Sequence, residues 1–414
     1  MGWQLGLYRL ATHALPLVAA PVLRRRLAAG REDPARWREK LGEASAARPE
    51  GRLIWLHAVG LGEVLALRGL IAALAAQDPD LNFLVTSTAR SSAQVMAANL
   101  PPRTQHQFLP LDAPRFLDRF LAHWRPDLSV WAEQDLWPGA VAAADGAGVP
   151  LALVNARMNA DAFARRARAR GLYADLFARF RLVAAQDAAT ARHLAALGAP
   201  APRVSGSLKA AAPPLAADPG EMAALQQALR GRSLWLLASS HPEDEAPALD
   251  AHRNRLAEDP AALLVIAPRD PNRAPAISDA TVALGLTVAR KSQSPRPAPA
   301  TQVHIVDAFG DLGLWYRLAP LALIGGTFGP TEGHNPWEPA ALGCAILHGP
   351  RIANFAADFA ALDGAGAACA VTPETLGSAL MQDHAAMAAR ALALSQAAKD
   401  SLSPLAADLI GLMA

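Results

Sequence analysis

Short apolar runs alternate with longer helix-forming segments along most of the chain, starting near residue 52. Several runs are almost continuously apolar, which is typical of strands buried on both faces. The segments between them are long enough for helices that connect parallel strands. The pattern predicts an α/β protein with a doubly wound parallel sheet. The runs lie at residues 53–59, 82–88, 106–110, 127–133, 150–156, 181–186 and 203–207.

The same alternation starts again after residues 210–220, a segment rich in Pro and small residues that is typical of a linker. We therefore expect two Rossmann-like domains, residues 31–212 and 213–414, which face a cleft. Ligands of such sheets bind beyond the carboxyl ends of the strands, so candidate chemistry is sought in the loops there. The second series of runs lies at residues 233–240, 262–268, 286–290, 302–309, 321–326 and 344–349.

The N-terminal segment is mostly apolar over residues 2–23 but contains Arg9, and three arginines follow it at 24–26. A membrane-spanning helix needs about 20 predominantly apolar residues, and a cleavable signal peptide carries its positive charge before the apolar run. Apolar residues followed by basic ones are expected where the body of the protein stays in the cytoplasm. Residues 1–30 are predicted to anchor the chain at a membrane interface, the alternative being a helix packed on the protein's own surface.

Composition narrows the function classes. The chain has 414 residues, 52% hydrophobic and 18% charged, and a formal net charge of only +2. These values fit two globular domains and give no indication of a nucleic-acid partner. The two cysteines, Cys344 and Cys369, form no metal-ligand spacing with histidines. A disulfide framework and a zinc ribbon are thereby excluded, and no metal site is expected.

A Gly-rich loop in the second half is the most specific local signal. It follows a predicted strand, contains four glycines within residues 325–333, and leads into a helix predicted to begin at Asn335. The pattern fits either a well-capped helix or a cradle for a phosphate; the glycines and the preceding histidine favour the cradle. The candidate binding residues are Gly326, Thr327, Gly333, His334, Asn335, Pro336, Trp337 and Glu338.

Two other strand ends in the second half carry candidate binding residues. Pro268 ends the run at 262–268 and Arg269 follows it directly, so its guanidinium is expected in the cleft, where it suits a phosphate or a carboxylate; the alternative is a surface ion pair. Phe309 ends the run at 302–309, and Gly310 and Asp311 follow it; this segment can present backbone groups to a base, or form an ordinary turn.

In the first half, charged residues follow three predicted strands. Glu63 lies in the first turn of a predicted helix, where it either offsets the helix dipole or acts as a general base. Glu133 and Asp135 follow another strand, and Lys209 closes the domain. A helix with arginines at 165, 166, 168 and 170 is either a solvated face or a site for lipid phosphates.

Together these motifs resemble the 3-deoxy-D-manno-octulosonic acid (Kdo) transferases of lipopolysaccharide synthesis. The resemblance implies that the protein has a GT-B fold. It also implies that the protein acts at the cytoplasmic face of the bacterial inner membrane. It also implies transfer of Kdo from CMP-Kdo to a lipid A precursor (lipid IVA), without a metal and without an obligate protein partner. It rests on REKLG (38–42), HAVGLGE (57–63), EQDLWPG (133–139), VNAR (154–157), GSLK (206–209), ASSHPEDE (238–245), APRDP (267–271), the GDL of 310–312 and EGHNPWEPA (332–340).

The resemblance also implies residue roles. Glu63 matches the family's proton acceptor, and Glu133 and Lys209 match residues that stabilise the transition state; the candidate residues of the second half match the CMP-binding segments. Departures such as Gly60 and Gly139 gather in the first half, so the donor is the firmer prediction than the acceptor. The alternatives are a different CMP-ulosonic acid, a UDP-sugar or another acceptor, or a non-catalytic nucleotide-binding paralogue.

Overall fold

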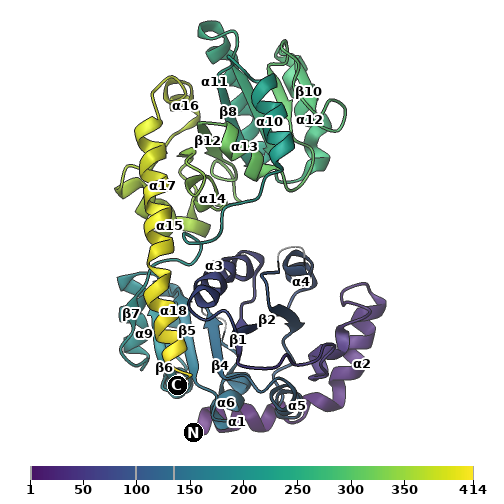
Figure 1. The fold of residues 1–414 in the computed structure, drawn as a ribbon, viewed down its shortest axis with the longest axis vertical. Coiled ribbons are helices and arrows are strands. Elements are labelled where there is room, and N and C mark those ends of the chain that lie inside the picture. Colours follow the sequence, from purple (N-terminus) through teal and green to yellow (C-terminus); the bar gives the residue numbers. More distant parts are fainter. Residues whose placement is uncertain (1, 98–99, 134–135, 414) are drawn as a thin grey trace. The chain divides into compact units, whose positions relative to one another are not determined.

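The computed structural model describes residues 2–97, 100–133 and 136–413, which form two compact units. The first unit is Met1–Ala212 together with Ala398–Ala414, and the second is Pro213–Ala397. Each contains a seven-stranded parallel sheet flanked by helices (Figure 1). The predicted α/β class with two doubly wound, Rossmann-like sheets is confirmed. The chain passes between the units at Ala212, inside the predicted linker.

The sheet of the first unit has the strand order β3-β2-β1-β4-β5-β6-β7. Successive residues of β1 point to opposite faces: Leu53 and Trp55 join one apolar cluster, and Ile54 and Leu56 join the other. Since both faces are covered, β1 is buried throughout, as the unbroken apolar runs predicted. The strands are β1 (Leu53–His57), β2 (Asn82–Ser87), β3 (Thr104–Phe108), β4 (Leu128–Ala132), β5 (Leu151–Ala156), β6 (Phe180–Ala185) and β7 (Arg203–Val204). The helices that follow the strands are α3 (Leu61–Gln77), α4 (Arg90–Ala97), α5 (Pro114–Trp124), α6 (Pro138–Gly146), α7 (Ala160–Ala167), α8 (Arg170–Phe177) and α9 (Ala188–Ala196).

The sheet of the second unit has the order β10-β11-β9-β8-β12-β13-β14 and separates two further clusters in the same way. Its strands are β8 (Leu234–Ser240), β9 (Leu263–Pro268), β10 (Val288–Arg290), β11 (Val303–Ile305), β12 (Leu321–Ile324), β13 (Ala345–His348) and β14 (Ala368–Ala370). Its helices are α10 (Pro219–Ala228), α11 (Pro242–Glu258), η2 (Pro271–Arg273), α12 (Ala274–Ala283), α13 (Leu312–Leu318), α14 (Trp337–Ala340), η3 (Ala353–Phe355), α15 (Ala356–Gly364), α16 (Pro373–Ala379) and α17 (Ala385–Asp400).

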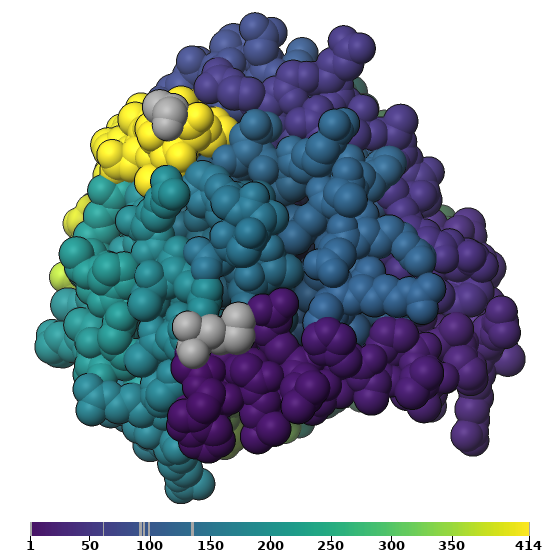
Figure 2. All heavy atoms as spheres, turned by 90° about the horizontal axis from the view of Figure 1, so that it is seen from below, coloured from purple at the N-terminus to yellow at the C-terminus, as the bar shows by residue number. Residues whose placement is uncertain are grey.

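The N-terminal segment forms two short helices, α1 (Trp3–Thr12) and α2 (Leu15–Ala28), followed by the short helix η1 (Trp37–Leu41). Among the described residues, no helix combines the length and hydropathy needed to span a bilayer. Helix α1 packs against α6 and α8 of the first unit, Leu5 enters its core, and Tyr8 Oη donates a 2.6 Å hydrogen bond to Asp112. Figure 2 shows this dark purple segment lying against the blue and teal part of the surface. A single apolar anchor helix, as predicted from the sequence, is therefore replaced by a helix pair fixed to the first unit.

The C-terminal helix α18 (Leu402–Gly411) belongs to the first unit, whereas the sequence pattern placed it in the domain 213–414. It packs on α3, and its buried face adds Leu402, Leu405 and Leu409 to the cluster on that side of the sheet. Gln77 Nε2 also donates a 2.7 Å hydrogen bond to the carbonyl of Ser403. The final residues of the chain thus complete the core that supports α3.

Replacing Leu405 by Ala is expected to destabilise the first unit by about 2–5 kcal/mol, because the change leaves a cavity under α3. The free energy of unfolding is measured by chemical denaturation with probes in each unit. The control is Leu392→Ala on α17, a leucine that is 45% exposed, where a change within about 0.5 kcal/mol is expected. Equal effects of the two variants would contradict the role given to α18.

Candidate functional site

Three predicted residues of the first unit meet at the carboxyl end of its sheet. Glu133 directly follows β4, Lys209 follows β7, and Glu63 lies in the first turn of α3 after β1. Lys209 Nζ lies 3.2 Å from Glu133 Oε1, and the two side chains are only 11% and 14% exposed. The sheet thus brings together a carboxylate and an ammonium group whose residues lie 76 positions apart in the sequence (209 minus 133). Asp135, the second acid predicted here, lies outside the described residues.

Burial dominates the electrostatics of Glu133. It raises the pKa of this carboxyl group; Lys209 opposes the rise, and the nearby Glu63 adds to it. The backbone of Glu133 is left-handed (φ 65°), a conformation that costs a non-glycine residue roughly 1–2 kcal/mol. The fold therefore holds this side chain in place at an energetic cost, which is typical of functional sites.

Asn155, at the end of β5, connects the ion pair to the chain segment that carries Lys209. It is buried and also left-handed (φ 53°). Its side-chain carbonyl accepts a 2.9 Å hydrogen bond from the Leu208 amide, and its Nδ2 donates a 3.4 Å bond to Glu133 Oε1. The sequence predicted no role for this asparagine, although it belongs to the VNAR motif. Its position at the end of a predicted strand was the available signal.

Glu63 folds its carboxylate back over the loop before α3. A Cβ on Gly60 would overlap Glu63 Oε2, so the glycine makes room for this arrangement. That oxygen is buried and has no hydrogen-bond partner among the residues described. A buried carboxylate oxygen normally has a partner, so Glu63 carries an unsatisfied acceptor atom, and its charge acts on the nearby Glu133.

In the second unit, the Gly-rich loop after β12 is held by a buried carboxylate. Asp244, in the first turn of α11, accepts hydrogen bonds from the amides of Gly326 (2.6 Å), Phe328 (3.2 Å) and His241 (2.9 Å). Gly326 is left-handed (φ 71°), which glycine adopts without strain. Sequence reasoning gave Asp244 no role, because a carboxylate that binds only backbone amides leaves no side-chain pattern.

Several predicted residues of this loop have structural contacts. Thr327 is buried, and its hydroxyl donates to the Ile324 carbonyl (2.6 Å) and accepts from the Gly349 amide (2.8 Å). Gly333 is left-handed (φ 89°), and its amide donates to the Gly326 carbonyl (2.8 Å). These residues shape the loop from within.

The predicted helix at Asn335 begins at Trp337 and is only four residues long. Asn335 Oδ1 accepts the Trp337 amide (3.1 Å), so it caps this turn, with Pro336 between them. Trp337 is buried, and its indole N–H donates to Asp358 (2.7 Å). Because so short a helix sums few peptide dipoles, an anion here would depend on nearby cations and individual amides.

Charged and titratable groups of the second unit surround this loop. Arg269 follows β9 and is exposed; its amide donates to the Ser240 carbonyl (3.0 Å), and Pro268 before it is buried. Burial raises the pKa of Glu338 to about 7, opposed by Asn335 and Arg269. Burial, with His241 and Arg269, lowers the pKa of His334 to about 4. Arg269 is thus electrostatically coupled to both predicted residues of the loop.

The segment after β11 is the third predicted binding element of this unit. Phe309 is 72% exposed, and Gly310 is left-handed (φ 98°). Asp311 accepts a 2.7 Å hydrogen bond from Lys291 Nζ, so its carboxylate already has a cationic partner. An exposed ring and exposed backbone remain to contact a ligand.

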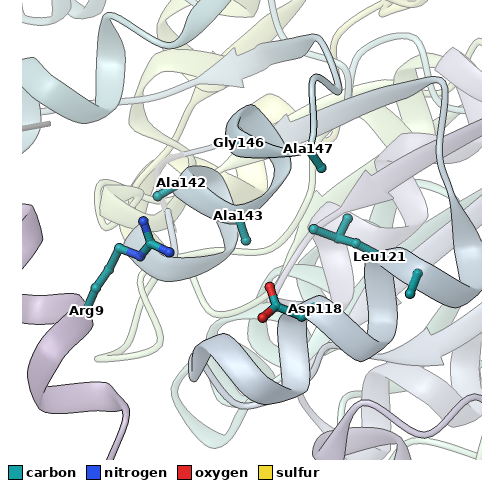
Figure 3. Close-up of a pocket in the computed structure, with 8 residues that line it drawn as sticks. Arg9, Asp118, Leu121, Ala142, Ala143, Gly146 and Ala147 are labelled. Atoms are coloured by element: carbon teal, nitrogen blue, oxygen red, sulfur yellow. The ribbon is translucent and has the colours of Figure 1, made fainter.

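A shallow groove lies elsewhere, between α5 and α6 of the first unit (Figure 3). Its volume is about 450 Å³, and none of the predicted site residues lines it. Alanines of α6 form one wall, and Arg9 of α1 and Asp118 of α5 lie at its rim. Within the described part of the chain, no three His, Cys, Asp or Glu side chains are grouped so as to hold a metal ion.

Comparison with known proteins finds relatives of one family and a solved structure of similar fold. Residues 35–212 match the family model for 3-deoxy-D-manno-octulosonic-acid transferase (kdotransferase). The chain is 36% identical to a probable 3-deoxy-D-manno-octulosonic acid transferase, mitochondrial, of Arabidopsis thaliana, over 84% of this chain and 80% of that protein. It is 33% identical to the 3-deoxy-D-manno-octulosonic acid transferase of Rickettsia bellii, over 79% and 78%. The crystal structure of UDP-GlcNAc 2-epimerase from Neisseria meningitidis has a similar fold (TM-score 0.55, 14% identity, 85% of this chain and 99% of that one).

Replacing Lys209 by Met is expected to raise the pKa of Glu133 further, because the carboxylate loses the cation that opposes its burial. Breaking a buried pair typically destabilises a protein by about 3–5 kcal/mol. The loss of unfolding free energy should be largest at neutral pH and shrink as the pH falls, since protonation of Glu133 removes its unpaired negative charge. Chemical denaturation across pH measures it, with Lys399→Met on α17 as control. A loss that does not depend on pH would contradict the assigned coupling.

Proposed function

Because this chain belongs to the family of 3-deoxy-D-manno-octulosonic acid (Kdo) transferases, we propose that it transfers Kdo from CMP-Kdo to a lipid A precursor, lipid IVA, in lipopolysaccharide biosynthesis. It is a glycosyltransferase with two Rossmann-like units. The observation that best supports the proposal is the unpartnered carboxylate oxygen of Glu63 close to the buried Glu133–Lys209 pair. This is the arrangement that proton removal and charge stabilisation require.

Glu63 is the general base of the proposed reaction. An acceptor hydroxyl attacks the anomeric carbon of Kdo, and the bond from that carbon to the CMP phosphate breaks. The phosphate leaves with the bonding electrons, and the hydroxyl proton passes to the carboxylate of Glu63, whose Oε2 has no partner among the described residues. The first turn of α3 holds this residue at the end of the sheet.

The Glu133–Lys209 pair stabilises charge as the bonds change. A glycosyl transition state resembles an oxocarbenium ion, so positive charge grows on the sugar while negative charge grows on the departing phosphate. A carboxylate and an ammonium held 3.2 Å apart supply one fixed charge of each sign. Charges fixed in advance need no reorganisation during the reaction, and this is their main advantage over water.

The second unit binds CMP-Kdo in the proposal. Arg269 provides a guanidinium for an anionic group of the donor. The exposed segment around Phe309 contacts the nucleoside, and the loop from Gly333 to Glu338 surrounds the phosphate. No metal takes part in this scheme, because Arg269, Lys209 and backbone amides supply the positive charge.

The helices α1 and α2 bring the enzyme to the cytoplasmic face of the inner membrane in the proposal. Large apolar side chains point outward from both helices, and Leu17 is 80% exposed. Such apolar faces are suited to the boundary between headgroups and acyl chains. Arginines at 24 and 25 on α2, and at 165 and 168 on and beside α7, are exposed and can bind lipid phosphates. The outward apolar residues are Trp3, Leu7, Leu10, Leu17, Val18 and Val22.

Replacing Glu63 by Gln is expected to lower Kdo transfer at least about a hundredfold, since general bases contribute roughly that much or more. CMP affinity should stay unchanged, because the proposed CMP contacts lie in the second unit. Transfer is followed by mass spectrometry and CMP binding by calorimetry, with the exposed Glu50→Gln as control. Full activity of Glu63→Gln would remove this residue from its role as base.

The double variant Leu10→Asp, Leu17→Asp is expected to lower binding to vesicles of phosphatidylethanolamine and phosphatidylglycerol at least about tenfold, because two leucines no longer enter the lipid. Vesicle flotation measures the bound fraction. Val282→Asp, which alters a 62% exposed residue of the second unit, is the matched control. Undiminished flotation of the double variant would show that this face does not contact the membrane.

A further inference from the structure

Two histidines of the second unit meet across neighbouring loops. His241 precedes α11, and His334 lies in the Gly-rich segment before α14. Their Nε2 atoms are 2.9 Å apart, the ring centres are 5.1 Å apart, and the ring planes differ by 10°. In a face-to-face stack the equivalent nitrogens would be about as far apart as the centres. The much shorter nitrogen distance therefore places the rings edge to edge, with an Nε2–H···Nε2 hydrogen bond nearly in the plane of both.

This contact limits the protonation of the pair. One ring must carry its proton on Nε2, and the other must present a lone pair there. Thr331 Oγ1 lies 3.4 Å from His241 Nδ1 on the opposite side of that ring. If His241 donates from Nδ1 to Thr331, His334 donates from Nε2 to His241, and His334 Nδ1 is left to accept a proton. The pair can then take up one further proton without losing its hydrogen bond.

The surroundings hold His241 firmly and bring a cation close to His334. Asp244 accepts the backbone amide of His241 and also those of Gly326 and Phe328, so one carboxylate fixes both loops. A Cβ on Gly326 would lie 3.4 Å from the His334 ring, so the ring rests directly on this loop. Arg269 and His241 act on His334 with the same sign of charge, while the carboxylate of Asp244 is turned to backbone amides. Three groups that are or can become cationic thus converge where the donor phosphate is proposed to bind.

We propose that His241 is a positioning residue of the donor site, which orients the His334 ring through their shared hydrogen bond so that His334 contacts the phosphate of the CMP group. The proposal rests on the function proposed above. His241 itself acts through His334 and need not touch the donor. The bound anion favours the protonated pair, so donor binding is coupled to the uptake of one proton.

A double-mutant cycle on CMP binding tests this assignment. The variants are His241→Phe, His334→Phe and the double variant, with His241→Gln as the conservative change whose amide can still accept the His334 N–H. His384→Phe is the matched control, since His384 belongs to the same unit and its ring is hydrogen-bonded to the Ala379 carbonyl (2.8 Å), away from the Gly-rich loop in the sequence. Calorimetry gives the Kd for CMP at several pH values, and thermal unfolding shows that each variant is folded.

We expect His241→Phe to weaken CMP binding about tenfold, and His241→Gln to recover most of the affinity. The effect of His241→Phe should vanish in the His334→Phe background, because the side chain acts through that ring. Wild-type affinity should fall as the pH rises, because the protonated pair favours the bound anion and because Glu338, whose pKa is raised to about 7, becomes negatively charged in the same loop. His334→Phe should lose the part of this pH dependence that belongs to the pair and keep the part that belongs to Glu338.

An unchanged Kd in His241→Phe, or an effect of equal size in the His334→Phe background, would overturn the assignment. A pH dependence of CMP affinity that is as large in His334→Phe as in the wild type would also overturn it, because the pair would then contribute none of it. If the wild-type protein does not bind CMP at all, the donor proposal fails first and this assignment fails with it. The results for the wild type and the variants therefore distinguish the two failures.

Discussion

The first unit depends on a buried ion pair whose charges must remain matched. Glu133 and Lys209 are almost completely removed from water, and the loss of hydration is offset only while both charges are present. The surrounding chain is arranged to keep them together: Glu133 and Asn155 adopt left-handed backbones, and the Asn155 amide joins Glu133 to the segment before Lys209. Backbone strain at two strand ends thus accompanies one fixed arrangement of the two charges.

The second unit also buries a carboxylate, that of Asp244, which accepts hydrogen bonds from backbone amides. Asp244 is buried, yet it has three amide donors and needs no cation. It ties the start of α11 to the Gly-rich loop, close to His241, His334 and Arg269. In both units, a buried acid at the carboxyl end of a parallel sheet organises loops from different parts of the sequence. A GT-B transferase needs such order in each half, because donor and acceptor chemistry have separate requirements.

Much of the fold follows from local pattern. The unbroken apolar runs predicted most strands of both sheets, and the linker at 210–220 contains the point where the chain changes unit. Glu63, Glu133 and Lys209 were found from motifs, and the sheet brings them together. What the pattern missed depends on contacts between distant residues. Helix α18 returns to α3 across more than 300 residues, as the Gln77–Ser403 bond shows, and no periodicity encodes that. Asn155, His241 and Asp244 act through hydrogen bonds whose partners only the folded chain reveals, and Thr327 and Trp337 proved to have internal partners.

This enzyme is proposed to join Kdo to a lipid A precursor. The most direct measurement is to incubate the purified protein with CMP-Kdo and lipid IVA and to determine the mass of the lipid product. A mass gain of one or more Kdo residues, together with release of CMP, is the expected result. Unchanged lipid, under conditions where the protein is folded and binds CMP, would contradict the proposed acceptor and direct the search to other hydroxyl-bearing glycans.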